Sequence, residues 1–171
     1  MRPVMIAALV GGILTIALGA EAQQQPADPI TQPVPEAMPN YIPYGEPIRL
    51  AEARKVLSKA LTEADKHNWK LACAVVEPSG DLVAFEKMDD TQYASIQIAQ
   101  DKAQAAARFR RSTKAFFDTV KGGNAAPLGL RGTVASEGGW PIQRNGKMTG
   151  AIGCSGAASN QDAVAARAGA E

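Results

Sequence analysis

The sequence contains few of the residues that carry nucleophilic catalysis and metal binding. Among its 171 residues there is one histidine, His67, and there are two cysteines, Cys73 and Cys154. A C-x-x-C metal or redox motif is therefore absent. A serine or cysteine triad would have to use His67 as its base, and residues 153–156 (Gly-Cys-Ser-Gly) do not fit the G-x-S-x-G nucleophile elbow. These absences argue against a hydrolase.

Neither the charge balance nor the glycine spacing indicates a nucleotide or a nucleic acid as partner. The chain has 18 Lys and Arg against 17 Asp and Glu, a net charge of +1. Gly150, Gly153 and Gly156 do not have the G-x-G-x-x-G spacing, and they follow a hairpin arm rather than a βαβ unit. In the arm from Met148 to Cys154, Gly150 and Gly153 instead indicate that another part of the chain approaches closely.

The first 22 residues have the pattern of a secretory signal peptide. Arg2 precedes an apolar run from Val4 to Ala20, and residues 20–22 (Ala-Glu-Ala) match a cleavage site. The run is diluted by glycines and is shorter than the roughly 20 residues of a membrane span, which argues against an anchor. We predict cleavage after Ala22 and a bacterial protein that is periplasmic or secreted, with no membrane association after cleavage.

Export would place the two cysteines in an oxidising compartment, where thiols can pair. Cys73 and Cys154 both fall in expected strands, so they could be neighbours in one sheet. Cysteines on apolar strands are also common as buried small apolar residues, and no spacing rule ties this pair. The sequence leaves a disulfide open.

Residues 23–47 contain seven of the eleven prolines of the chain. Such a segment cannot form a helix or a central strand, so we expect an extended tail or linker. Its end, residues 41–44, carries two tyrosines and an isoleucine that suit contact with the domain or with a neighbouring subunit. The remaining residues, 48–171, are expected to form one domain with one core.

This domain alternates helices with β-hairpins. Asn145-Gly146 is typical of a two-residue type I′ turn, because both central residues of that turn need positive φ. Residues 71–77 form a continuous apolar run, so both faces of that strand should be covered, whereas residues 82–88 should reach solvent. The order predicts an α/β (α+β) fold with a mainly antiparallel sheet and helices packed against it. The expected elements are a helix over 48–66, strands over 71–77 and 82–88, a helix capped by Asp90 or Thr91 and ending at Phe109, a helix over 113–121 capped by Ser112, a loop over 124–137, the hairpin around Asn145-Gly146, and a helix capped by Ser159 or Asn160 and reaching Ala168.

The helix that ends at Phe109 is rich in alanine. Ala99, Ala103, Ala106 and Ala107 allow it to lie close to a sheet, and its charged residues supply a polar side.

Several of these segments, in the same order from about residue 50 to residue 169, resemble one known family. They are Ala74–Ala84, Lys87-Met88-Asp89, Ser95 with Ala99 and Asp101-Lys102-Ala103, Phe109–Thr113, Gly138–Ile142, and Asn145-Gly146 through Gly150–Gly156. The chain is similar to the GlcG/HbpS family of haem-binding proteins, which is related to the C-terminal domain of PduO. The resemblance implies a five-stranded, profilin-like antiparallel sheet, homo-oligomers, and haem binding with storage or redox sensing in some relatives.

Two positions depart from the family pattern. Glu77 stands where relatives carry aspartate, and the histidine that ligates haem in PduO-type relatives has no equivalent at the matching position. His67, the histidine of this chain, lies at a helix-to-strand corner where relatives have glycine or small residues.

Haem iron takes His, Met, Tyr or Cys as axial ligand. The candidates are His67 as the metal ligand, Met88 and Tyr93 at one rim of the sheet, and Lys102 and Arg110 as partners of the propionates. Each has an ordinary structural alternative. His67 can be a solvated partner of a helix dipole, Met88 and Tyr93 can be rim packing, Lys102 can lie on a solvated helix face, and Arg110 can bridge two helices.

Two functions from different classes follow. The first is an exported, non-catalytic protein that binds haem or another tetrapyrrole, for storage or redox sensing. The alternative is a small-molecule isomerase or lyase with Lys102 and Asp89 in a shared cleft, because proton transfer needs only one tuned base. A homo-oligomer without a ligand is also compatible with the sequence.

Overall fold

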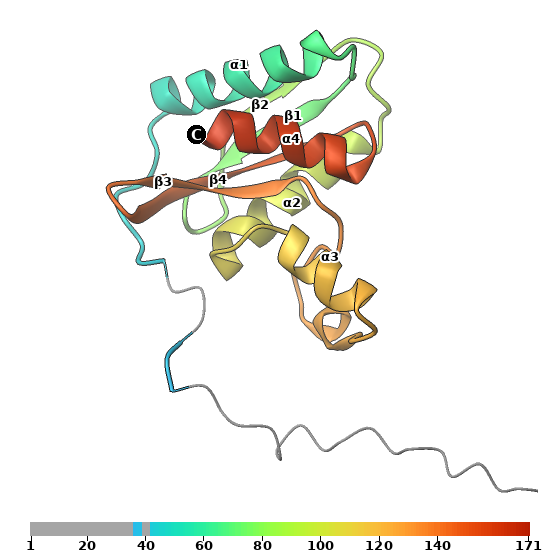
Figure 1. Cartoon of the computed structure of the whole chain (residues 1–171). Helices are drawn as coiled ribbons and strands as arrows, with labels where there is room; N and C mark the ends of the chain where they lie inside the picture. The colour runs from blue at the N-terminus through green and yellow to red at the C-terminus, as the bar shows by residue number, and fades with distance from the viewer. Residues whose placement is uncertain (1–35, 39–41) are drawn as a thin grey trace, which may run out of the picture. The chain divides into compact units, whose positions relative to one another are not determined.

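The computed structural model describes residues 36–38 and 42–171, and the predicted signal peptide at residues 1–22 lies outside them, as does most of the predicted linker (Figure 1). None of the helices in this described part is long and apolar enough to cross a membrane. The elements are α1 (Leu50–Lys66), β1 (Ala72–Val76), β2 (Leu82–Lys87), α2 (Ser95–Phe109), α3 (Lys114–Lys121), the 3-10 helix η2 (Ala126–Gly129), β3 (Gly139–Arg144), β4 (Lys147–Ser155) and α4 (Ser159–Ala170).

Both hairpins belong to one antiparallel sheet with the strand order β2-β1-β4-β3. The prediction of a mainly antiparallel sheet is confirmed, but the prediction of five strands is wrong, because the described residues form a sheet of four. Beside the first residues of β4, which β1 does not reach, residues 43–48 make only a partial ladder. The N–H of Met148 donates to Pro43 O at 2.8 Å and the N–H of Gly45 donates to Met148 O at 2.8 Å. Proline has no N–H to donate, so Pro43 and Pro47 limit the pairing to one parallel bridge between Tyr44 and Met148.

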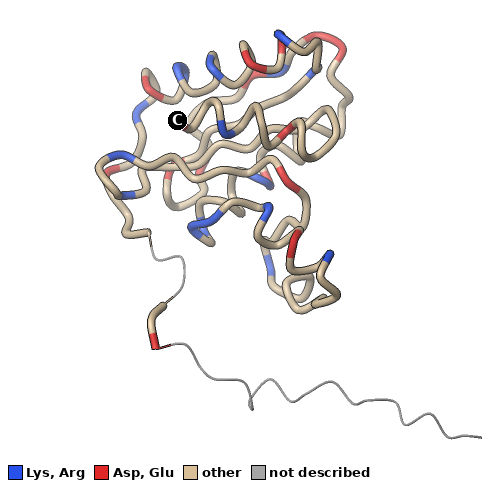
Figure 2. The backbone as a smooth tube through the Cα atoms, viewed as in Figure 1, with Lys and Arg blue, Asp and Glu red and all other residues tan. Residues whose placement is uncertain are grey.

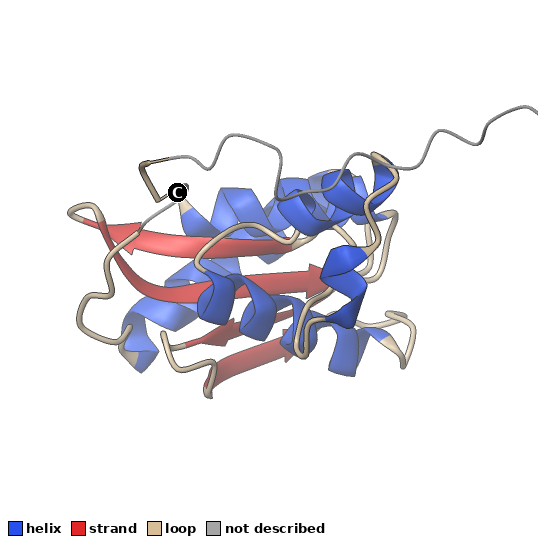
Figure 3. Cartoon of the chain, turned by 90° about the horizontal axis from the view of Figure 1, so that it is seen from below, coloured by secondary structure: helices blue, strands red, loops and turns tan. Residues whose placement is uncertain are grey.

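The sheet lies between two helical layers, with α1 and α4 on one face and α2 on the other (Figures 1 and 3). All five residues of β1 are buried, which confirms that both faces of this strand are covered. Cys73 and Val75 pack toward α1 and α4, whereas Ala72, Ala74 and Val76 pack toward α2. Strand β2, at one edge of the sheet, has exposed ends, as its sequence predicts.

The backbone of α2 lies directly on β4. A Cβ atom added to Gly153 would clash with Ala99 O and with the backbone nitrogen of Ala103. The glycine in the strand and the alanines in the helix therefore form one close contact, as the sequence predicts.

Cys73 and Cys154 are paired residues of β1 and β4, and they form a disulfide in the core beneath α1 and α4. The structure thus answers the question that the sequence left open. The bond ties the two hairpins together at the centre of the sheet.

The predicted turn at Asn145-Gly146 is confirmed, whereas the predicted N-terminal caps of the helices are wrong. Asn145 and Gly146 have φ of 54° and 72°, as a type I′ turn requires. Helix α2, however, starts at Ser95 rather than after a cap at Asp90 or Thr91. Asp90 adopts a left-handed turn with φ of 64°, and the Thr91 hydroxyl donates to Met88 O at 2.9 Å.

The other two predicted caps also differ. Thr113 is the N-cap residue of α3 and Ala158 that of α4, so Ser112, Ser159 and Asn160 do not occupy those positions. At α4 the Ala158 N–H donates to the side chain of Gln161 at 3.0 Å, which satisfies one backbone group at the helix start.

Candidate functional site

The five residues that the sequence predicts for a site lie in three separate places. His67, Met88 and Tyr93 follow the ends of α1 and β2 and precede α2, Lys102 is in the interior, and Arg110 follows the far end of α2. The 15 residues of α2 span roughly 22 Å at 1.5 Å per residue, so Tyr93 and Arg110 cannot line one compact site.

His67 is the C-cap residue of α1 and its side chain is 47% exposed. Its ring stacks on Trp69 with 4.4 Å between ring centroids, and Nε2 lies 3.4 Å from Glu63 Oε1. The Lys66 ammonium, bonded to the same carboxylate, lowers the pKa of Glu63. His67 therefore has the surroundings of a solvated residue at a helix end.

Met88 and Tyr93 do not form a pocket with His67. The Met88 thioether sulfur accepts a bond from Leu71 N–H at 3.5 Å and packs against the core. The Tyr93 side chain points into solvent, since the residue is 86% exposed.

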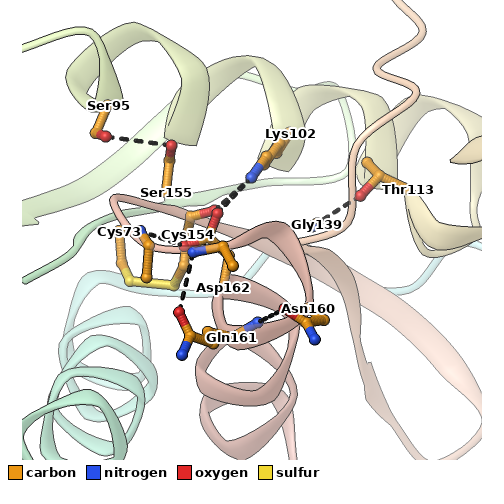
Figure 4. Close-up of polar contacts among 12 residues, drawn as sticks. Cys73, Ser95, Lys102, Thr113, Gly139, Cys154, Ser155, Asn160, Gln161 and Asp162 are labelled. Atoms are coloured by element: carbon orange, nitrogen blue, oxygen red, sulfur yellow. Dashed lines mark hydrogen bonds and ion pairs between the residues drawn. A yellow bond between two sulfur atoms is a disulfide. The ribbon is translucent and has the colours of Figure 1, made fainter. Parts of the chain in front are cut away.

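Lys102 is buried, with 1% of its surface exposed. Its Nζ donates to Asp162 Oδ2 at 2.8 Å and to Cys154 O at 3.1 Å (Figure 4). Gly138 crosses directly over the pair, where an added Cβ would lie 2.9 Å from Nζ. The predicted cleft shared by Lys102 and Asp89 is therefore wrong, because the Lys102 ammonium is paired with Asp162 inside the protein. The alternative, a lysine on a solvated helix face, is wrong for the same reason.

The ion pair connects the two helical layers past the end of β4. Burial raises the pKa of the Asp162 carboxyl, while the Lys102 ammonium and the bond from Ala157 N–H oppose that rise. A buried charge is tolerated when its partner supplies opposite charge and hydrogen bonds, and this pair supplies both. The arrangement suits a structural connection between α2 and α4 rather than a reactive amine.

The remaining buried polar side chains near this pair are also bonded. The Ser95 and Ser155 hydroxyls lie 3.2 Å apart, and the Gly139 N–H donates to Thr113 Oγ1 at 2.9 Å (Figure 4). Across residues 36–38 and 42–171, no buried side-chain nitrogen or oxygen lacks a partner. In the same part of the chain, no group of three or more His, Cys, Asp or Glu side chains could hold a metal ion.

Arg110 bridges the end of α2 to the segment that precedes α1. Its guanidinium lies over the Tyr44 ring at 5.2 Å from the centroid, and Nη1 donates to Ile42 O at 3.3 Å. On the same ring, the Tyr44 hydroxyl lies 3.4 Å from Arg108 O, and Arg108 Nε donates to Ser79 O at 3.0 Å. Tyr44 is thus held between two arginines and the turn that joins β1 to β2.

A hollow of about 410 Å³ opens at this point, lined by Tyr44, Pro78, Ser79 and Arg108, and we call it the Tyr44 hollow. Tyr44 also borders a second hollow of about 490 Å³ beside the β3–β4 turn. Two further hollows, of about 610 Å³ along α1 and about 230 Å³ beside Arg110 and Arg111, have no His, Cys, Met or Tyr in their linings.

Sequence reasoning missed Tyr44 because it assigned residues 23–47 to a tail. A usable signal was present, since Tyr44 and Gly45 stand between two prolines at the only aromatic cluster of that segment. What the sequence could not show is that Arg108 and Arg110 face this tyrosine.

Comparison with known proteins gives consistent matches. The model of the HbpS-like family, described as haem-degrading protein HbpS-like, matches residues 48–171. Protein GlcG of Escherichia coli (strain K12) is 36% identical over 103 residues, which are 60% of this chain and 77% of GlcG. A 15.0 kDa protein from the dhaT-dhaS intergenic region of Citrobacter freundii is 34% identical over 124 residues, 70% of this chain and 87% of that protein.

Solved structures agree with these matches in fold. The crystal structure of HbpS has a TM-score of 0.68 and 26% identity and covers 78% of this chain and 95% of its own. The PduOC:haem complex has a TM-score of 0.65 and 23% identity and covers 72% of this chain and 92% of its own.

Proposed function

This chain belongs to the HbpS-like family, and on that basis we propose that it is an exported, non-catalytic haem-binding protein. The observation that carries the proposal is the family match over residues 48–171, which takes in every helix and strand of the domain. The likeness to a haem complex, the PduOC structure, supports it.

The residues present fit haem in their chemistry. A bound haem needs a donor to iron, apolar contacts for the macrocycle and positive charge near the propionates. Cys73 and Cys154 are bonded to each other and cannot ligate iron, but the side chains of His67 and Tyr44 are partly exposed. Bound haem would supply redox chemistry, and the chain would hold it for storage or for redox sensing.

A hemin titration of the mature protein tests this function. Binding predicts a shifted Soret band that saturates at a fixed ratio of hemin to protein. The same titration into the urea-unfolded chain is the control, because nonspecific adsorption does not need the fold. No saturable shift with the folded protein would remove the proposal.

The family description also names haem degradation, so the complex is tested for turnover in the same cuvette. With ascorbate and oxygen added, a non-catalytic protein leaves the Soret band at least as stable as that of free hemin. Faster loss of the band, with release of iron, would contradict the non-catalytic part of the proposal.

Export and removal of residues 1–22 are a further part of the proposal. The Cys73–Cys154 disulfide supports it, because disulfides persist mainly in oxidising compartments. Cell fractionation followed by intact mass measurement should find a periplasmic or secreted chain that begins at Gln23 and carries the disulfide. A cytosolic chain that retains residues 1–22 would contradict export.

The last part of the proposed function is that the chain forms a homo-oligomer. It is supported by the family resemblance and by exposed apolar side chains at Tyr93, Leu128 and Leu130. Size-exclusion chromatography with light scattering should give a mass above that of one chain, and a monomer at micromolar concentration would contradict it.

A further inference from the structure

The geometry points to Tyr44 as the residue that ligates haem iron in this chain, with Arg108 and Arg110 as partners of the propionates. This inference rests on the proposed haem binding and assigns the position at which it occurs. It replaces His67, the donor that the sequence alone favours.

Tyr44 is held in place although it lies before the first helix. The backbone on both of its sides is bonded to Met148 of β4, through Pro43 O and through the Gly45 N–H. The residue is 49% exposed and borders the Tyr44 hollow. The hydroxyl lies 3.4 Å from Arg108 O, longer than the 2.5–3.0 Å of a good O–H···O bond, so little is lost when this oxygen changes partner.

Positive charge gathers around this ring. Arg110 lies over its face and Arg108 stands at the edge of the hollow, and Figure 2 shows basic positions together where α2 ends. Guanidinium groups bind carboxylates through two parallel hydrogen bonds, and the bond to Ser79 O uses only the Nε donor of Arg108. The nearby Asp81 carboxylate accepts a bond from the Ser79 hydroxyl at 2.8 Å.

The space at Tyr44 is of the right order for a small molecule. The Tyr44 hollow measures about 410 Å³, and binding sites for small molecules and cofactors usually span about 300–1,000 Å³. Pro78 and the tyrosine ring give it an apolar wall. Among the four hollows described above, only the two bordered by Tyr44 contain a side chain that haem iron accepts as a ligand.

The surroundings of His67 suit a bound haem less well than those of Tyr44. The His67 ring is stacked on Trp69 and its Nε2 faces the Glu63 carboxylate. Arg108 and Arg110, at the end of α2, are a helix length away from the residues that precede it. The cation beside His67, Lys66, is already paired with the Glu63 carboxylate, so a haem bound at His67 would lack the arginines that Tyr44 has beside it.

Ligation at Tyr44 balances without a redox step. The Tyr44 oxygen would hold ferric iron as a phenolate, and the proton of the phenol would leave with the hydroxide of hemin as one water molecule. No electron donor would be required.

Tyr44→Phe is the direct test, because it removes the oxygen and keeps the ring under Arg110. Hemin affinity should fall by about tenfold or more, which is 1.4 kcal/mol or more, and the ferric absorption and electron paramagnetic resonance spectra should change. Tyr93→Phe is the matched control and should bind like the wild type. His67→Ala should also leave binding unchanged, and Tyr44→His, which restores a donor, should recover affinity with a different Soret maximum.

A second pair of measurements tests the arginines. Arg108→Gln and Arg110→Gln should weaken hemin binding several-fold but leave hemin dimethyl ester, which has no free propionate, unaffected. The inference is overturned if the wild type binds hemin and Tyr44→Phe binds it equally well with the same spectrum. If the wild type shows no saturable binding, the proposed function itself fails.

Discussion

Replacing Lys102 by methionine should destabilise the fold by about 3–5 kcal/mol at about pH 7. Methionine has a similar length, so the substitution removes the charge and the bonds to Asp162 and Cys154 O without leaving a large void. The Asp162 carboxylate then stays buried with only backbone N–H groups, those of Ala157 and Gly156, as its partners among these groups. A buried charge without its counterion is expensive because its lost hydration is no longer offset.

The cost should also depend on pH. Burial raises the pKa of the Asp162 carboxyl and Lys102 opposes the rise, so the pKa should be still higher in the variant. A carboxyl whose pKa is raised by folding contributes stability that is fully present below its unfolded pKa and is lost as pH increases through its folded pKa. At about pH 5 more of Asp162 is protonated in the variant than at neutral pH, so the destabilisation should be smaller there.

Urea unfolding followed by the fluorescence of Trp69 and Trp140 measures both effects. The Lys102→Met/Asp162→Asn variant is the matched control, because it leaves no lone charge and keeps an acceptor for the Ala157 N–H. It should recover most of the loss. A cost below about 1 kcal/mol at neutral pH, or a cost that does not change with pH, would refute the burial of this pair.

Two further predictions concern the sheet. Replacing both Cys73 and Cys154 by alanine should lower the free energy of unfolding by roughly 4–5 kcal/mol, since the disulfide spans a sequence separation of 81, and a dithiothreitol-dependent shift of the urea midpoint in the wild type should agree. An unchanged midpoint would mean that the thiols are not paired. Gly153→Ala should lower the free energy of unfolding by about 1–3 kcal/mol, because the new methyl group meets the backbone of α2. Gly129→Ala, which has open space around it, is the control and should lie within about 0.5 kcal/mol of the wild type. Thermal unfolding of both variants measures the difference.

Structural features whose physical cause lies in neighbouring residues could be predicted from the sequence. The turn at Asn145-Gly146 needs two positive φ values, and the dipeptide itself supplies them. The close approach of α2 to β4 could also be inferred, because glycine in a strand and alanine in a helix leave room for two backbones to lie close together. In both cases the physical cause lies within one segment.

Features that depend on distant partners were not predictable. Asp162 is 60 residues from Lys102, and no local signal distinguishes this lysine from the exposed ones that are usual on helices. Tyr44 depends in the same way on Arg108 and Arg110. The fifth strand was expected from family resemblance alone, and the described residues outside the four strands add one isolated bridge, between Tyr44 and Met148.

The residues that carry the family resemblance mostly serve the fold. Lys102 forms an internal ion pair with Asp162, and Gly138 leaves room for that pair. Gly153 lets the backbone of α2 lie close to β4. A chain that keeps these residues keeps the sheet and its two helical layers whatever it binds, so the resemblance by itself does not locate a ligand. The position that does offer a donor, cations and space is Tyr44, which precedes the matched region at residues 48–171. Haem affinity in this chain should therefore respond to changes of the half-exposed Tyr44 side chain while the stability of the domain stays nearly constant.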